Sequence, residues 1–244
     1  FKTKKELQEA VNLWCVNREA CIKKYGHISN WDVSQITNMS ELFENKKYFN
    51  DDISGWDLSS VTNMCMMFYN ATNFNKPIGD WDVSNVTNMY GMFKYAHEYN
   101  QLIGDWDVSN VKNMHSMFFE ARKFNQPIGK WVVSSVTSMY SMFNDATNFN
   151  QPIGDWDVSN VVHMTNMFKY ATKFNQPIGG WDVSSVTDIN RSWEEVKFDL
   201  INSLNKKLKP KNNKLKYQRD RNTRYQNKLI CLGCLVIVFI IHKI

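Results

Sequence analysis

The chain has 244 residues, of which 43% are hydrophobic and 14% aromatic, so it can bury a sizeable core. Its formal net charge of +5 is concentrated in Asn205–Lys228, which holds ten Lys and Arg residues against one acid, Asp220. The remaining chain is near neutral or mildly acidic, so its charge does not indicate specific binding to nucleic acid. The five cysteines lack zinc-ligand spacing, apart from an isolated Cys231-Leu-Gly-Cys234, and predict neither a metal site nor a disulfide framework.

Residues 1–30 precede the repeated part of the chain. The segment from Lys5 to Lys24 is rich in helix formers and has Leu7, Val11, Trp14 and Ile22 roughly on one side. Stacked repeats leave an apolar face open at each end, and such faces need a cover. We therefore expect residues 1–30 to form an N-terminal helical cap.

Tryptophan then recurs with a period of 25 residues. It occupies Trp31, Trp56, Trp81, Trp106, Trp131, Trp156 and Trp181. A fixed period of this length indicates one structural unit, copied and stacked, with the tryptophans as an internal ladder. The pattern predicts a solenoid over residues 31–196, whose seventh unit degrades after Val186 into a C-terminal cap.

The sequence pattern of each unit predicts a short strand, a short helix and a tight corner. In the third unit Trp81–Val83 alternates as a short strand does, and Ser84 suits a helix N-cap. A helical apolar stripe follows at Val86, Met89, Met92, Phe93 and Ala96. A corner follows at 99–104. Four other units read Phe-Asn-x-Pro-Ile-Gly at this place, and proline and glycine there stop a helix. The expected fold class is thus an α/β repeat solenoid of about seven units.

Polar residues also form ladders at this period. We expect the asparagines at Asn50, Asn75, Asn100, Asn125, Asn150 and Asn175 to satisfy backbone groups of the corner. Aspartates follow tryptophan at Asp32, Asp57, Asp82, Asp107, Asp157 and Asp182. They are predicted to accept hydrogen bonds from amides of the next turn. The alternative is a row of calcium sites, which Val132 would interrupt.

The C-terminal part departs from the repeat. Residues 197–228 are basic and poor in apolar residues, which predicts a disordered linker. Residues 229–244 are a short apolar segment, for which we expect a membrane anchor; the alternative is a truncated or unstructured end. The basic linker would keep the repeats on the cytoplasmic side, as in a tail anchor.

The unit W-D-V-S-x-V-T-x-M-x-x-M-F-x-x-A-x-x-F-N-x-P-I-G resembles that of the BspA-like leucine-rich-repeat surface proteins, specifically the 25-residue mycoplasma-lipoprotein-type repeat. The match spans 31 to about 193. It implies a leucine-rich-repeat-like solenoid, exposure at the cell surface, and adhesion or protein interaction. The surface location differs from the cytosol-facing one that the charges favour.

The variable positions of the units are the best candidates for function. Two rows four residues apart would share a helix face, and their aromatic members, together with one histidine, are expected to be exposed and to bind a protein partner. These are Tyr69, Tyr90, His115, Phe119 and Tyr140. They could instead pack on neighbouring helices. No catalytic or cofactor-binding motif is present, so we expect a non-enzymatic interaction module without cofactor or metal. The alternatives are a passive spacer and an intracellular membrane-tethered scaffold.

Overall fold

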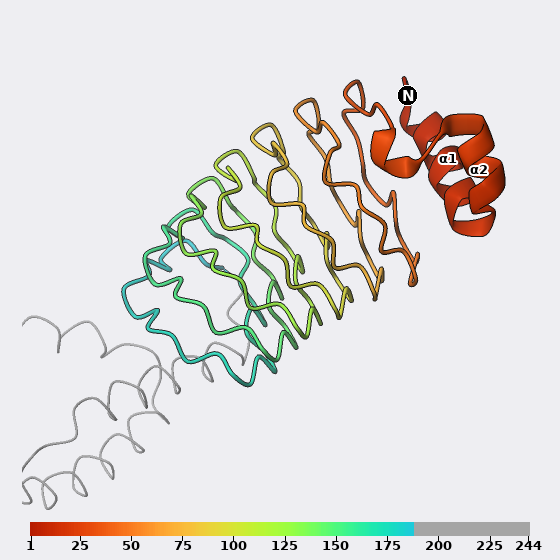
Figure 1. The fold of residues 1–244 in the computed structure, drawn as a ribbon. Coiled ribbons are helices and arrows are strands. Elements are labelled where there is room, and N and C mark those ends of the chain that lie inside the picture. Colours follow the sequence, from red (N-terminus) through yellow and green to blue (C-terminus); the bar gives the residue numbers. More distant parts are fainter. Residues whose placement is uncertain (188–244) are drawn as a thin grey trace, which may run out of the picture. The chain divides into compact units, whose positions relative to one another are not determined.

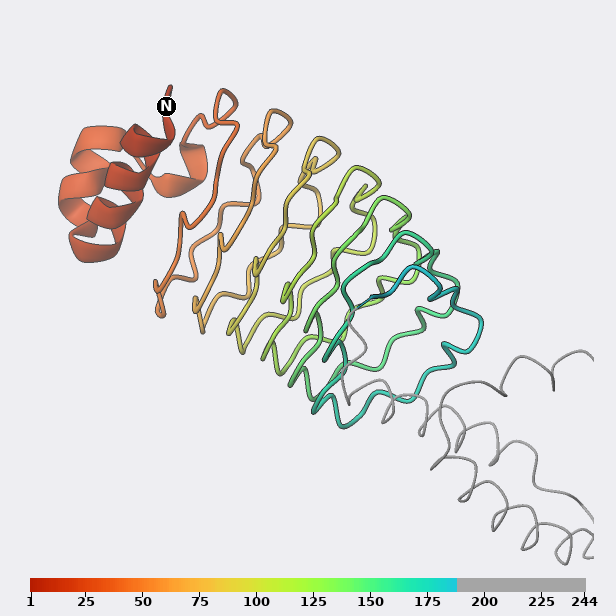
Figure 2. The ribbon, with the colours of Figure 1, turned by 180° about the vertical axis from the view of Figure 1, so that it is seen from behind.

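The structure, a computed structural model, describes residues 1–187. Its helices are α1 (Lys4–Val16), α2 (Arg18–Tyr25) and the 3-10 helix η1 (Ile28–Asn30). From residue 31 the chain winds into coils of 25 residues, which lie side by side in chain order (Figures 1 and 2). We number them coil 1 (31–55), coil 2 (56–80), coil 3 (81–105), coil 4 (106–130), coil 5 (131–155) and coil 6 (156–180), and the first residues of a seventh follow.

Three sequence predictions fall outside the described residues. They are the C-terminal cap that ends at 196, the basic linker at 197–228 and the membrane anchor at 229–244. Within residues 1–187 no helix has the length and hydropathy needed to cross a bilayer.

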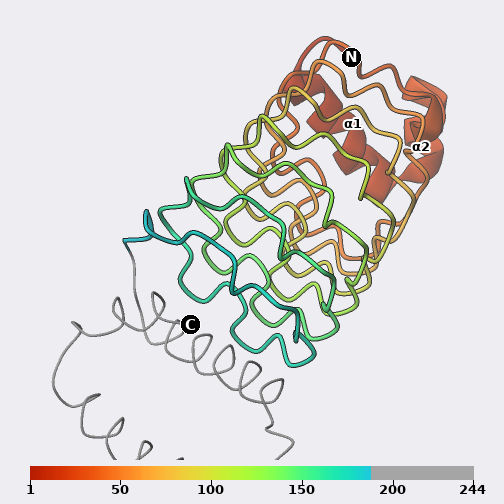
Figure 3. The ribbon, with the colours of Figure 1, turned by 90° about the vertical axis from the view of Figure 1, so that its left-hand side faces the viewer.

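The predicted α/β repeat solenoid is wrong. In the described coils there is neither a strand nor a helix; the three helices all precede residue 31. The β-bridges within the described coils are isolated parallel ones, one between each pair of neighbouring coils from coil 1 to coil 6. These bridges link Asn38, Asn63, Asn88, Asn113, Ser138 and His163 in succession. Ser84 and its equivalents therefore cap no helix, and each unit is one winding of turns and irregular segments, as a view turned by 90° shows (Figure 3).

A string of overlapping turns replaces the predicted helix. In coil 2 the amides of Met67, Tyr69 and Ala71 each donate to the carbonyl three residues earlier. The amides between them donate to the next coil instead. These bonds run from Met64 to Asn88 (2.9 Å), Met66 to Tyr90 (2.7 Å), Phe68 to Met92 (2.9 Å) and Asn70 to Lys94 (2.8 Å). An α-helix would use all of these amides internally, so stacking and helix formation compete for the same donors.

This arrangement requires a left-handed backbone at two positions of every coil. Eleven residues other than glycine have positive φ: Glu41, Asn45, Met66, Asn70, Tyr95, Ser116, Glu120, Ser141, Asp145, Asn166 and Tyr170. Only Gly91 stands where glycine would remove the steric cost. The left-handed conformation costs roughly 1–2 kcal/mol per residue. The bonds between coils must offset that cost.

Aromatic ladders fill the space inside the coils. Phe68 stacks on Phe93 at 5.6 Å, and within one coil it stacks on Phe74 at 4.0 Å. Equivalent rings continue in both directions, and the methionine positions beside them are buried as well. Where one coil turns, its neighbour comes so close that a methyl group on Gly79 would lie 2.6 Å from the carbonyl oxygen of Leu102. Glycine is therefore required at that corner.

Each tryptophan of the predicted ladder is bonded to the preceding coil or to the cap. Nε1 of Trp56 donates to the carbonyl of Ile28 (2.9 Å), and that of Trp81 to Ile53 (3.2 Å). Trp106, Trp131, Trp156 and Trp181 repeat the bond, whereas Trp31 donates to Gly26. All are buried except Trp181, which is partly buried. An indole that buries its ring and satisfies its N–H in this way fixes the register between coils.

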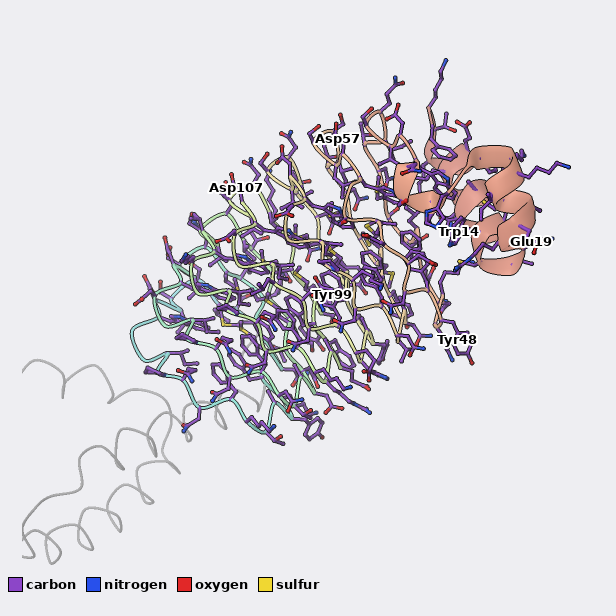
Figure 4. All side chains as sticks on the ribbon, viewed as in Figure 1. Trp14, Glu19, Tyr48, Asp57, Tyr99 and Asp107 are labelled. Atoms are coloured by element: carbon purple, nitrogen blue, oxygen red, sulfur yellow. The ribbon has the colours of Figure 1, made fainter. Side chains whose placement is uncertain are left out.

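The two polar ladders bind backbone amides, as expected. Asn75 Oδ1 accepts the amide of Asn100 in the next coil (2.9 Å), and Asn50, Asn100, Asn125 and Asn150 do the same, whereas Asn175 is described only as a donor. Asp57 Oδ1 accepts the amide of Ser59 (3.0 Å), as its equivalents accept theirs. Asp57 and Asp107 lie at the outer tips of their coils (Figure 4).

The single helix expected from Lys5 to Lys24 is two helices, because Asn17 interrupts it. Asn17 is the C-cap of α1 and the N-cap of α2, and its side chain accepts the amide of Ala20 (3.0 Å). Helix α1 packs on coil 1, where Gln8 donates to the carbonyl of Leu42 (3.0 Å). The apolar side of α1 is buried there, including Trp14. The first coil therefore never exposes its open face.

We expect Tyr99→Phe to stabilise the fold. Tyr99 replaces a phenylalanine of the ladder and is fully buried, and among residues 1–187 its hydroxyl has no hydrogen-bond partner. Burial holds the pKa of this phenol well above its usual value. Removing an unsatisfied hydroxyl should raise the free energy of unfolding by about 1–2 kcal/mol, measured by urea denaturation. Phe124→Tyr is the matched control and should lower it, whereas equal stability of all three proteins would contradict the prediction.

We also expect the fold to lose stability in acid. Hydrogen bonds from the following serine hydroxyl and amide lower the pKa of Asp32, Asp57, Asp107 and Asp157. A carboxyl with a lower pKa in the folded state stabilises fully above its unfolded pKa, and that contribution disappears as pH falls through the folded value. Thermal midpoints should thus drop below about pH 4. A protein with Asp57→Asn, Asp107→Asn and Asp157→Asn should show a shallower drop; an identical drop would refute the assignment.

Candidate binding surface

Aromatic side chains form two rows across coils 2 to 5. In one row the ring of His115 lies 4.8 Å from Tyr90 and 4.7 Å from Tyr140. In the other, Tyr95 contacts Tyr69 at 5.4 Å and Phe119 at 5.3 Å, both edge to face. We call these six residues the aromatic strip. Edge-to-face pairs of this kind stabilise by about 0.5–1.5 kcal/mol each, so the strip is a preformed surface.

Lys94 lies between the two rows. Its ammonium is 4.5 Å from the ring centre of Phe119 and 5.3 Å from that of Tyr95. Burial lowers the pKa of Lys94, while the nearby Glu120 acts in the opposite direction. The side chain is half-buried, so this cation is held against aromatic faces.

His115 is the member of the strip whose side chain type titrates closest to neutral pH. Its pKa is lowered by burial first and then by the charges of Lys94 and His163. Lys94, whose ammonium lies over the rings of Tyr95 and Phe119 in one row, is thus also close enough to affect His115 in the other. The neutral imidazole is therefore favoured, and the ring presents itself as an aromatic surface with two polar nitrogens.

The five residues predicted for binding all lie in the strip, but their setting differs from the expectation. Tyr69, Tyr90, His115, Phe119 and Tyr140 are half-buried rather than exposed, and they lie on turns rather than a helix face. The sixth member, Tyr95, was missed. On a helix it would point away from Tyr69, whereas its positive φ of 63° in the turn string goes with direct contact to Tyr69 and Phe119.

Charged side chains border the strip beyond Phe119. Glu120 Oε2 accepts from Arg122 (2.7 Å) and lies 3.7 Å from Nε2 of His97, and Arg122 also approaches Asp145 (3.6 Å). In the described part of the chain no three His, Cys, Asp or Glu side chains converge as metal ligands would. Arginine, tyrosine and phenylalanine beside a charged rim are the residue types typical of protein interfaces.

The fold and this surface define a repeat protein made of stacked 25-residue coils, with aromatic side chains at variable positions of coils 2 to 5. The model of one protein family, described as Mycoplasma protein of unknown function, DUF285, matches the chain twice, over residues 14–122 and 97–207. The chain belongs to this family. No curated protein and no solved structure matches it significantly.

Replacing Lys94 should raise the pKa of His115. Lys94→Met removes a positive charge beside the ring but keeps a similar apolar volume, so the imidazolium becomes less unfavourable. The pKa, followed through the ring-proton shifts of His115 by NMR, should rise but stay below its ordinary value because burial remains. Lys112→Thr removes a charge from the solvent-exposed position where other coils carry threonine and should leave the pKa unchanged. An unchanged pKa in Lys94→Met would contradict the coupling.

Proposed function

We propose that the protein is a non-enzymatic interaction module and that it binds a protein partner through the aromatic strip. The observation that carries this proposal is the concentration of Tyr69, Tyr90, Tyr95, His115, Phe119 and Tyr140 in adjoining coils. The corresponding places in coil 1 hold Ser40, Glu44 and Asn45. The repeat itself therefore has no structural need for aromatic rings there.

The energetics of interfaces support the same choice of surface. Tyrosine and arginine are enriched among residues whose truncation costs most binding energy, and partly buried rings lose little conformational freedom on binding. The resemblance of the repeat unit to BspA-like surface proteins supports a role in contact with other molecules, including adhesion at a cell surface.

The test replaces strip residues by those that other coils already carry. The strip variant combines Tyr90→Ser, His115→Thr and Tyr140→Ser, as at Ser40 and Thr165. The control variant combines Leu102→Pro and Val132→Asp, which removes two exposed apolar side chains outside the strip and restores the common residues. Both variants should remain folded.

Wild-type protein is cross-linked to its partner in cells, and the partner, once identified by mass spectrometry, is titrated against all three proteins by calorimetry. We expect the strip variant to bind at least tenfold more weakly, which corresponds to about 1.4 kcal/mol, and the control to match the wild type. A partner whose affinity is unaffected by the strip variant would place the binding surface elsewhere. Recovery of no partner would favour a passive spacer.

A further inference from the structure

A second candidate site lies between the helical cap and coil 1. A cleft of about 490 Å³ is lined by Trp14, Cys15, Val16 and Arg18 on the cap side. On the coil side the lining runs from Asn45 to Phe49 and includes Asp51. Trp14 lies at the junction of cap and coil, and Tyr48 at the tip of coil 1 on the same side (Figure 4). Cavities of this size hold ligands of many atoms rather than single ions.

Coil 1 breaks the repeat pattern where it lines this cleft. Lys46 stands where every later described coil has alanine, at Ala71, Ala96, Ala121, Ala146 and Ala171. Lys47 and Tyr48 stand at positions that vary between coils, which hold Thr72 and Asn73 in coil 2 but Arg122 and Lys123 in coil 4. The alanines are buried, whereas Lys46 is half-buried and Lys47 exposed. At the one invariant position of the three, the cationic Lys46 has thus replaced a small apolar side chain.

The charge of the cleft is positive. Its one carboxylate, Asp51, accepts from Arg18 Nη2 at 2.7 Å and from Trp14 Nε1 at 2.9 Å, which accounts for both its charge and its position. Lys46 and Lys47 both line the cleft, and no ion pair within residues 1–187 balances their charges, which favours an anionic ligand.

Apolar surface borders these charges. Tyr48 is 89% exposed and Val16 is 86% exposed, although both have large hydrophobic side chains. Neither residue is covered by packing between the cap and coil 1. A ligand that matched this cleft would bring carboxylates to the lysines and an apolar group to Tyr48 and Val16.

We propose that this cleft binds an acidic peptide segment that carries an apolar side chain among its carboxylates. The site is distinct from the aromatic strip, which lies on coils 2 to 5, so the two proposals stand independently. The cap then both covers the first coil and forms one wall of a binding site.

The probe is a fluorescein-labelled peptide, Glu-Asp-Phe-Glu-Asp, titrated with the full chain by fluorescence anisotropy at low salt. The cleft variant combines Lys46→Ala, Lys47→Thr and Tyr48→Asn, so that coil 1 adopts the residues of coil 2. The matched control combines Lys112→Thr and Lys173→Asn, which removes two positive charges elsewhere and again restores residues found in other coils. Lys46→Arg with Lys47→Arg keeps the charge and tests whether any loss reflects misfolding.

We expect the cleft variant to bind the peptide at least tenfold more weakly, while the matched control and the arginine variant stay within twofold of wild type. The neutral peptide Gln-Asn-Phe-Gln-Asn should bind at least tenfold more weakly than the acidic one. Equal binding by the cleft variant, or equal binding of the neutral peptide, would overturn the proposal.

Alkylation of Cys15 tests the location. This exposed thiol lines the cleft, whereas Cys65 lies in coil 2 and is half-buried. Bound peptide should slow iodoacetamide labelling of Cys15 at least threefold and leave Cys65 unaffected, as measured by peptide mass spectrometry. Binding without protection of Cys15 would overturn the assignment to this cleft.

Discussion

The structure depends on a division of backbone amides between two uses. Along the turn strings of coils 1 to 5, one amide closes a local turn and the next bonds the following coil. A backbone amide that is buried without a partner costs a large part of a protein's net stability, so neither use can be abandoned. A coil is consequently stable only between neighbours, and the cap replaces the missing neighbour at the N-terminal end.

Side chains act on this backbone arrangement by fixing its spacing and register. The phenylalanine stacks, with ring centres 5.3–5.7 Å apart, hold adjacent coils at the distance that the hydrogen bonds need. The indole bond from Trp106 to the carbonyl of Ile78 prevents one coil from sliding along the next. Apolar packing and directional bonding thus specify the same alignment, which is the consistency expected of a sequence with one native structure.

Much of the internal arrangement could be predicted from sequence, because a side chain repeated every 25 residues must meet its own copies. The tryptophan ladder and the amide-binding asparagines follow from that argument. The predicted helix was wrong, because burial at Met64, Met67, Phe68 and Ala71 fits a turn string as well as a helix. Apolar spacing reports which side chains point inward, but it does not report where the amides bond. The same error hid Tyr95 from the predicted binding surface, and the cap cleft was hidden because it joins segments far apart in sequence.

The alternation of amides has a consequence for how such a chain can change its length. Adding or deleting one residue in a turn string would exchange the amides that close local turns with those that bond the following coil, along the remainder of that coil. It would also place the positive φ angles at residues that otherwise have negative φ. Adding or deleting 25 residues leaves every contact between coils as before. Growth and shrinkage by whole-coil duplication or loss are therefore nearly neutral for folding, whereas single-residue insertions are not. The interval between the cap cleft and the aromatic strip can be altered only in steps of one coil, so evolution can tune the separation of the two sites in discrete increments.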